Sequence, residues 1–261
     1  MIDRAEAILK GLGKKLLEWR ALGETDGQWV GTQLKAEADR RAHRFLLDAL
    51  HDSWPGIPVI SEEDSFGHDG ERPETYWLID PIDGTASFCG GFSGFVTQMA
   101  LLRDGKPVLG IVHAPALELT WRAEAGKAST RNGVPIHVAS VGMEKTLIDN
   151  YPEPRGIARV LFDELKFSRY VECGSIGLKL CRVADGTAHV FVKDVVVRDW
   201  DLAPAEIILA NAGGQVTVFS GQRVQYAGDM EKVGIIATAS AELAGEVHAW
   251  KALGGWPRKP G

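Results

Sequence analysis

The feature that most constrains this chain is a set of acidic clusters placed where apolar runs stop. Residues 76–80 are typical of a short buried strand, and Asp80-Pro81-Ile82-Asp83-Gly84-Thr85 stands at its end. Residues 57–61 lead in the same way into Glu62, and Trp200-Asp201 precedes a helical pattern. An isolated Asp-x-x-Asp often only caps a helix or braces a turn. Three clusters of this kind in one chain predict a shared site.

Composition describes an ordinary soluble globular protein. The 261 residues suffice for one large domain or two fused lobes, and 45% of them are hydrophobic against 25% charged. The 29 Lys and Arg and 35 Asp and Glu give a net charge of −6, which argues against a nucleic-acid polymer or a membrane surface as the main partner. No apolar stretch approaches the roughly 20 residues of a membrane span, and no cleavable signal pattern is seen, so we expect a cytoplasmic protein.

Cysteine and histidine usage excludes a sulfur- or nitrogen-ligated metal. Cys89, Cys173 and Cys181 are scattered and lack a Cys-x-x-Cys spacing, so we expect them to be buried thiols. The seven histidines form no His-x-x-x-His pair. A metal in this chain would therefore have oxygen ligands.

Hydrophobic periodicity predicts an α/β (α+β) protein with two parts. We expect residues 1–142 to form an N-terminal α+β lobe that carries most of the acidic residues, and residues 143–261 to form an α/β lobe that carries Asp201. The predicted helices cover about residues 5–23, 35–50, 157–167, 175–184 and 202–212 and the C-terminus. The predicted strands are 57–61, 76–80, 96–102, 107–112, 147–149, 170–173, 189–192, 215–218 and 234–238.

The acidic residues suit a hard divalent cation such as Mg²⁺, which prefers oxygen ligands and keeps several waters. Glu62, Asp80, Asp83 and Asp201 could supply these oxygens. Pro81 fixes the backbone between two of them, so that the Ile82 carbonyl can also face an ion. Gly84 allows a sharp turn into the start of a helix, where free N–H groups can hold a phosphate.

The same residues resemble a known family. Trp77-Leu78-Ile79-Asp80-Pro81-Ile82-Asp83-Gly84-Thr85 looks like the signature of the inositol monophosphatase superfamily of Mg²⁺-dependent, lithium-sensitive phosphomonoesterases. Trp200-Asp201-Leu202-Ala203-Pro204-Ala205-Glu206 with Ala212-Gly213-Gly214 is similar to its second signature. Glu62 and Ala36-Glu37-Ala38-Asp39 match its upstream acidic positions. The resemblance implies a layered αβαβα sandwich with the active site between the lobes.

The resemblance also implies a role for each acidic residue. One ion would be held by Glu62, Asp80 and the Ile82 carbonyl, and a second by Asp80, Asp83 and Asp201. Two to three Mg²⁺ ions would bind in each site, with Mn²⁺ as a substitute and Li⁺ or Ca²⁺ as inhibitors. Thr85 and Asp39, together with Glu62, would orient and deprotonate the attacking water. The residues that would contact substrate are Asp83, Gly84, Thr85, Gly174, Ser175, Lys179 and Asp201.

The expected substrate is a small phosphorylated molecule. Pro58-Val59-Ile60-Ser61-Glu62-Glu63-Asp64 and Tyr76-Trp77 look closest to the bacterial CysQ-type 3'(2'),5'-bisphosphate nucleotidases. Ala86-Ser87-Phe88 departs from the Lys-Glu-Phe of many of these enzymes and also from the Thr-Asn-Phe of inositol phosphatases. Inositol 1-phosphate and histidinol phosphate therefore stay open as alternatives.

Two further alternatives concern what kind of protein this is. A non-catalytic phospho-ligand binding protein is disfavoured, because converging carboxylates repel one another without metal. The family that the chain resembles includes monomers and dimers, so a homodimer stays open. Lys179 either lines the substrate pocket or only decorates a helix.

Overall fold

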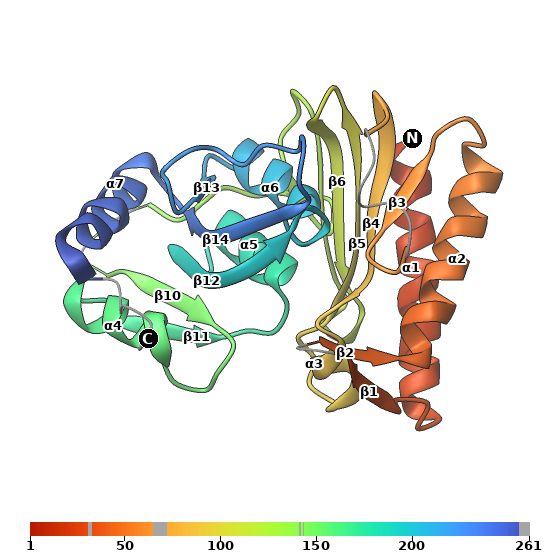
Figure 1. Cartoon of the computed structure of the whole chain (residues 1–261), viewed down its shortest axis with the longest axis horizontal. Coiled ribbons are helices and arrows are strands. Elements are labelled where there is room, and N and C mark those ends of the chain that lie inside the picture. The colour runs from red at the N-terminus through yellow and green to blue at the C-terminus, as the bar shows by residue number, and fades with distance from the viewer. Residues whose placement is uncertain (31–32, 65–71, 141, 143, 256–261) are drawn as a thin grey trace.

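The computed structural model describes residues 1–30, 33–64, 72–140, 142 and 144–255, and it stacks them in five layers (Figure 1). Two long helices, α1 (Ile2–Ala21) and α2 (Glu37–Ser53), cover the outer face of a seven-stranded sheet. Helices α5 (Ile176–Ala184) and α6 (Asp199–Asn211) separate that sheet from a five-stranded one. Helices α4 (Gly156–Glu164) and α7 (Ala241–Trp250) form the last layer. The predicted αβαβα sandwich is confirmed.

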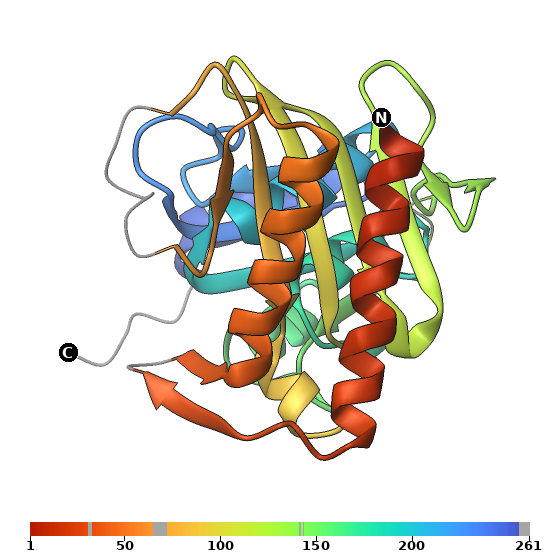
Figure 2. The ribbon, with the colours of Figure 1, turned by 90° about the vertical axis from the view of Figure 1, so that its right-hand side faces the viewer.

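The seven-stranded sheet runs in chain order and is antiparallel apart from its first pair, which is parallel. Its strands are β3 (Val59–Ser61), β4 (Thr75–Asp83), β5 (Val96–Arg103), β6 (Lys106–Ala114), β7 (Leu119–Glu124), β8 (Thr130–Arg131) and β9 (Val134–Pro135). A short hairpin, β1 (Gly27–Val30) and β2 (Gln33–Ala36), lies at one end of α2, as Figure 2 shows. The sequence pattern did not predict this hairpin, and the helix expected from about residue 35 begins at Glu37, because residues 33–36 pair as β2.

The five-stranded sheet is mixed and has the order β11-β10-β12-β14-β13. Its strands are β10 (Thr146–Asp149), β11 (Arg169–Glu172), β12 (Val190–Arg198), β13 (Gln215–Val218) and β14 (Glu231–Thr238). The lobe boundary expected at residues 142 and 143 falls between the strands of the two sheets, and residue 143 itself lies outside the described residues. The division into two domains stays a prediction.

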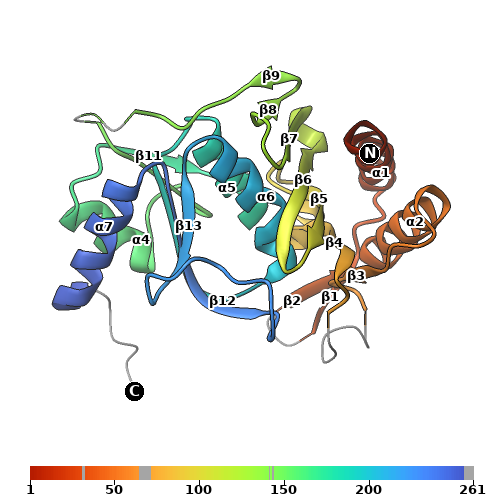
Figure 3. The same ribbon diagram turned by 90° about the horizontal axis from the view of Figure 1, so that it is seen from above.

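Apolar periodicity explains how the outer layer is held. Ala5, Ile8, Leu12, Leu16 and Trp19 recur at steps of three and four residues, and all five are buried against the sheet. The predicted amphipathic helix is confirmed, and it begins at Ile2, slightly earlier than the pattern indicated. Figure 3 shows α1 and α2 side by side on that face.

The middle layer joins the two sheets into one core. Helix α6 buries apolar side chains on several sides, among them Leu202, Ala203, Ile208 and Leu209, so it packs between the two sheets along most of its length. In β6, a Cβ on Gly110 would lie 2.2 Å from the Pro204 carbonyl oxygen, so the helix rests directly on the strand. One apolar cluster therefore runs from the first sheet to the second.

Three smaller outcomes concern the start of α6, the burial of the cysteines and the lack of a membrane-spanning helix among the described residues. Helix α6 begins at Asp199 rather than near residue 202, because the Arg198 N–H is capped by Asp201 and the first turn closes earlier. Cys173 and Cys181 are buried as predicted, whereas Cys89 is only half-buried. None of the helices among the described residues is long and apolar enough to span a membrane.

Candidate active site

Three carboxylates meet where β4 ends and α6 begins. One oxygen from each of Asp80, Asp83 and Asp201 lies within 4.8 Å of the others. In a regular strand, residues 80 and 83 would point to opposite faces. The pairing of β4 with β5 shifts register between Asp80 and Asp83, where Pro81 stands and cannot donate to the ladder. This irregularity lets both aspartates face the same space.

Backbone donors fix the orientation of each carboxylate. The Ile82 N–H donates to Asp80 Oδ1 at 3.0 Å, and the Gly177 N–H of α5 donates to Asp83 Oδ2 at 2.8 Å. The Arg198 N–H donates to Asp201 Oδ2 at 2.7 Å. The second oxygen of Asp80 is buried, and it has no hydrogen-bond partner in the part of the chain that the structure describes. A buried carboxylate oxygen of this kind calls for a cation.

The electrostatics of the cluster point the same way. Burial raises the pKa of Asp80 well above its usual range, and the nearby carboxylates of Glu62 and Asp83 raise it further. Burial also raises the pKa of Asp201, with Asp83 and Glu62 as the next causes. Several like charges held in one buried space need a compensating positive charge.

Glu62, at the end of β3, faces the same space. It is outside the group of three whose oxygens lie within 4.8 Å, but its carboxylate acts on the pKa of both Asp80 and Asp201. The Ile82 carbonyl, also expected to face an ion, accepts a hydrogen bond from Thr85 Oγ1 at 3.2 Å. Which ion each of these residues holds stays a prediction.

A threonine and an aspartate form the second part of the site. Thr85 Oγ1 donates to Asp39 Oδ1 at 3.1 Å, although the two residues are 46 positions apart. Asp39 lies in the first turn of α2, as predicted, and it is 3% exposed. Thr85 is the first residue of α3 (Thr85–Cys89), directly after Gly84 at φ +91°, so the predicted turn into a helix is confirmed.

The expected substrate residues from the second lobe lie close to the acidic cluster. Ser175 caps α5 by accepting from the Leu178 N–H, and its own N–H donates to the Gly94 carbonyl at 2.7 Å. A Cβ on Gly174 would lie 1.8 Å from the Gly94 oxygen, so only glycine allows this approach. These contacts hold the start of α5 against the first lobe. The substrate contacts themselves stay a prediction.

Lys179 is buried, so the alternative of a surface lysine on a helix is wrong. Its side chain is 1% exposed, and Nζ lies 4.8 Å from the centre of the Phe191 ring. Burial lowers the pKa of Lys179 to about 8. The positive charge of Lys179 stabilises the ionised carboxylate of Asp83 and so opposes the rise in the pKa of Asp83 that burial causes.

Sequence reasoning missed Gln98. This fully buried amide in β5 donates to Asp83 Oδ2 at 3.3 Å and to the Trp200 carbonyl at 3.1 Å, and it thereby links the two segments that carry the aspartates of the acidic cluster. A polar residue within the apolar run 96–102 was the available signal. Only the tertiary structure shows what the amide contacts.

Comparisons with known proteins decide the family. The family model described as inositol monophosphatase family matches residues 4–252. This chain belongs to the inositol monophosphatase family. It is therefore a phosphatase hydrolase of a metal-dependent family, and the acidic cluster could hold the metal.

The similar proteins in this family carry different names. The chain is 32% identical over 227 residues to a fructose-1,6-bisphosphatase/inositol-1-monophosphatase of Thermotoga maritima, which covers 85% of this chain and 86% of that protein. It is 34% identical over 199 residues to a 3'(2'),5'-bisphosphate nucleotidase CysQ of Escherichia coli, covering 72% and 78%. A solved Thermotoga maritima inositol monophosphatase superposes with a TM-score of 0.81 at 28% identity, covering 97% and 98% of the two chains. The predicted resemblance is confirmed at the level of family and fold.

Proposed function

We propose that the chain is a Mg²⁺-dependent phosphomonoesterase and that its substrate is a 3'(2'),5'-bisphosphate nucleotide such as adenosine 3',5'-bisphosphate. The convergence of Asp80, Asp83 and Asp201 beside the Thr85–Asp39 pair supports the reaction. The CysQ relatives, at 34% identity over 72% of the chain, support the substrate class.

The donor set fits a hard divalent cation. Its atoms are carboxylate and carbonyl oxygens, as Mg²⁺ prefers, and the buried Asp80 Oδ2 without a hydrogen-bond partner among the described residues is a ready ligand. Asp80, Asp83 and Asp201 would hold one ion, and Glu62 with the Ile82 carbonyl would join Asp80 around another. Bound Mg²⁺ would polarise the phosphate and lower the pKa of a coordinated water.

The Thr85–Asp39 pair would activate the attacking water. The Thr85 hydroxyl has a single hydrogen, and when this hydrogen is directed at Asp39 the oxygen lone pairs can accept a hydrogen bond from water. As the water attacks phosphorus, its proton passes to the Thr85 oxygen and the hydroxyl proton passes to Asp39. The phosphorus–oxygen bond to the alcohol breaks, the departing alkoxide takes a proton from solvent, and Asp39 releases its proton to solvent.

Binding of the phosphate would use the start of α3. The first N–H groups of a helix have no partner within the helix, and Gly84 at φ +91° brings the chain round so that Thr85 begins this one. From the second lobe, Gly174 and Ser175 are held close by the Gly94 contact and would face the rest of the substrate.

Inositol-1-monophosphatase activity is the second candidate. The Thermotoga maritima relative bearing that name spans more of this chain, 85%, than the CysQ relative does. Ala86 and Ser87 also remove the lysine with which many nucleotidases could meet a second phosphate.

Phosphate release distinguishes the candidates. The protein is assayed with Mg²⁺ on adenosine 3',5'-bisphosphate, inositol 1-phosphate and histidinol phosphate, with Asp201→Asn as the blank. We expect a kcat/KM at least about tenfold higher for the nucleotide, which corresponds to about 1.4 kcal/mol of transition-state binding. A higher value for inositol 1-phosphate would establish the second candidate.

The same assay tests the metal assignment. We expect Asp201→Asn to lose at least about a hundredfold in kcat/KM and to lose the rise in Tm that Mg²⁺ gives the parent. Full Mg²⁺-dependent turnover in Asp201→Asn would refute the role of this residue. Equal turnover of all substrates in the parent would instead indicate a broad phosphomonoesterase.

A further inference from the structure

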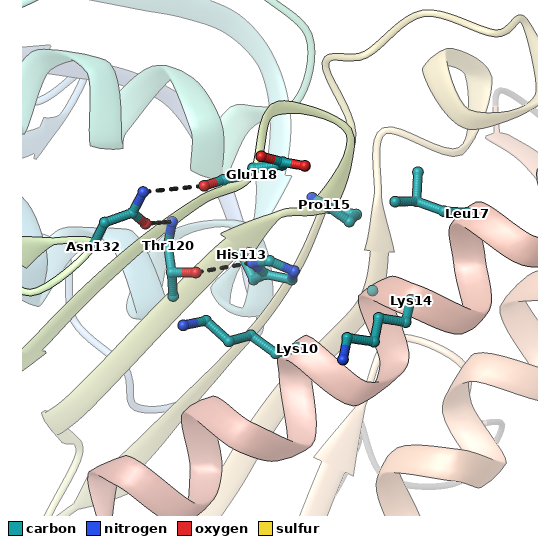
Figure 4. A pocket seen from close by; sticks show the side chains of 9 residues that line it. Lys10, Lys14, Leu17, His113, Pro115, Glu118, Thr120 and Asn132 are labelled. Atoms are coloured by element: carbon teal, nitrogen blue, oxygen red, sulfur yellow. Dashed lines mark hydrogen bonds between the residues drawn. The ribbon is translucent and has the colours of Figure 1, made fainter.

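A cavity lies apart from the acidic cluster, on the face of the first sheet opposite to α6. It lies between α1 and the strands β6 and β7 (Figure 4). Its volume is about 340 Å³, which is within the range of small-molecule sites. The residues that line it are Lys10, Gly13, Lys14, Leu17, His113, Pro115, Glu118, Thr120 and Asn132. None of them belongs to the acidic cluster or to the Thr85–Asp39 pair.

Glycine at position 13 brings the helix close to a histidine ring. A Cβ there would lie 2.6 Å from both Nε2 and Cδ2 of His113 and 3.0 Å from Pro115 Cβ. The α1 backbone therefore passes directly over the imidazole, and Nε2 is the ring nitrogen that faces the helix. Because they pack this closely, neither the α1 backbone nor the His113 ring can move toward the other.

Hydrogen bonds hold the sheet side of the cavity in one conformation. His113 Nδ1 lies 2.9 Å from Thr120 Oγ1, and the Thr120 N–H donates to Asn132 Oδ1 at 2.8 Å. The Asn132 amide then donates to the Glu118 carbonyl at 3.1 Å. The wall is thus built by a continuous set of contacts and does not depend on a ligand to order it.

The charges of the cavity are divided between its two sides. Lys10 and Lys14 come from α1, and Glu118 lies across the cavity from them in Figure 4. Lys10 also pairs with Glu6 at 2.5 Å, whereas Lys14 forms no ion pair within the described part of the chain. Leu17 and Pro115 supply an apolar surface next to the lysines. Glu6 offsets the charge of Lys10, so Lys14 supplies most of the positive charge on the helix side, with apolar contact area beside it.

We propose that this cavity binds the oxyanion end of a small organic phosphate or carboxylate. Lys14 and Lys10 would contact the anion as point charges, and Leu17 with Pro115 would pack against the organic body. The His113 ring would lie beside the anion, and a ligand there would touch both α1 and the first sheet.

His113 gives the site a direct readout. Burial is the main cause that lowers the pKa of His113 to about 4; Lys10 acts in the same direction, and the Leu119 carbonyl and Glu6 oppose it. Besides Lys10, the charged residues that line the cavity with His113 are Lys14 on α1 and Glu118 on the side of the sheet. A bound anion favours the charged imidazolium and must raise the pKa of His113.

The test is a titration of the Mg²⁺-loaded protein with phenylphosphonate, whose carbon–phosphorus bond a phosphomonoesterase does not hydrolyse. The imidazole proton resonances are followed by NMR, and His113→Gln assigns the relevant signal. We expect a saturable shift of that signal and a rise in its pKa. Absence of any saturable shift at millimolar ligand would overturn the proposal.

Two neighbouring lysines provide a matched pair of variants. Lys14→Met should weaken the binding of phenylphosphonate about tenfold, because one charged contact to the anion is lost. Lys15→Met should leave it unchanged, because Lys15 lies over the Phe45 ring, 5.7 Å from its centre, on another face of α1. Equal affinities in the two variants would place phenylphosphonate elsewhere and refute the site.

Benzoate in a parallel titration distinguishes the ligand classes. Weaker binding than that of phenylphosphonate assigns a phosphate, and equal or tighter binding assigns a carboxylate.

Discussion

At the scale of single residues, Glu206 is a buried carboxyl outside the acidic cluster whose pKa is raised by burial. This carboxyl on α6 lies beside the Tyr226 hydroxyl, and one of its oxygens has no hydrogen-bond partner among the described residues. Burial raises the pKa of Glu206 to about 7. Its proton is therefore held more tightly in the folded chain than in the unfolded one, where the pKa of a glutamate is near 4.5.

The sign of the resulting pH dependence follows from this raised pKa. The contribution of Glu206 to stability is greatest below the unfolded value and is lost as the pH rises through about 7. We expect Glu206→Gln to raise the free energy of unfolding by about 3 kcal/mol at pH 8 and by less than about 1 kcal/mol at pH 5. Urea unfolding with saturating Mg²⁺ measures both values. A difference that is the same at the two pH values would contradict the assignment.

At the scale of elements, helix α5 both carries a serine cap and contacts Asp83 of the acidic cluster. Ser175 accepts from the Leu178 N–H, and its hydroxyl also contacts Asp83. Ser240 caps α7 in the same way, through the Leu243 N–H, but it lies in the outermost layer. The two serines therefore separate the capping effect from the effect on the site.

We expect Ser175→Ala and Ser240→Ala each to cost about 1 kcal/mol of stability through the lost cap. Only Ser175→Ala should also lower kcat/KM, by about tenfold, because Asp83 loses an orienting partner. Thermal unfolding and phosphate release on both variants measure the two effects. Equal kcat/KM for the two variants would show that α5 does not act on the site through its cap.

At the scale of the whole molecule, α6 packs against both sheets. Gly110 leaves no room for a side chain beneath the Pro204 carbonyl, whereas exposed Gly245 in α7 has open space around it. The apolar cluster that includes α6 continues into both sheets. Loss of packing at Gly110 should therefore weaken both sheets together.

We expect Gly110→Ala to destabilise the protein by more than about 2 kcal/mol, since helix or strand must shift to admit the methyl group. Gly245→Ala should be neutral or stabilising by up to about 1 kcal/mol, because alanine favours a helix. Circular dichroism and tryptophan fluorescence should give coincident unfolding transitions in the parent and in both variants. Separate transitions would mean that the lobes unfold independently.

The sequence by itself determined the amphipathic helices and the acidic residues of the cluster, whereas the layered sandwich was implied by the family resemblance. Periodicity placed α1 and α2, and the acidic residues at the ends of apolar runs indicated Asp80, Asp83 and Asp201, whose oxygens the structure brings within 4.8 Å. Both signals are local: a helix face repeats every few residues, and an acidic residue at the end of an apolar run can be read within a short window.

Only the tertiary structure decided what joins those residues. The Thr85–Asp39 bond spans 46 positions, and Gln98 reaches the Trp200 carbonyl across 102. The register shift at Pro81 and the burial of Lys179 likewise depend on neighbouring elements. Such contacts are set by how layers pack, which a short stretch of sequence does not encode, because each partner alone is compatible with several environments.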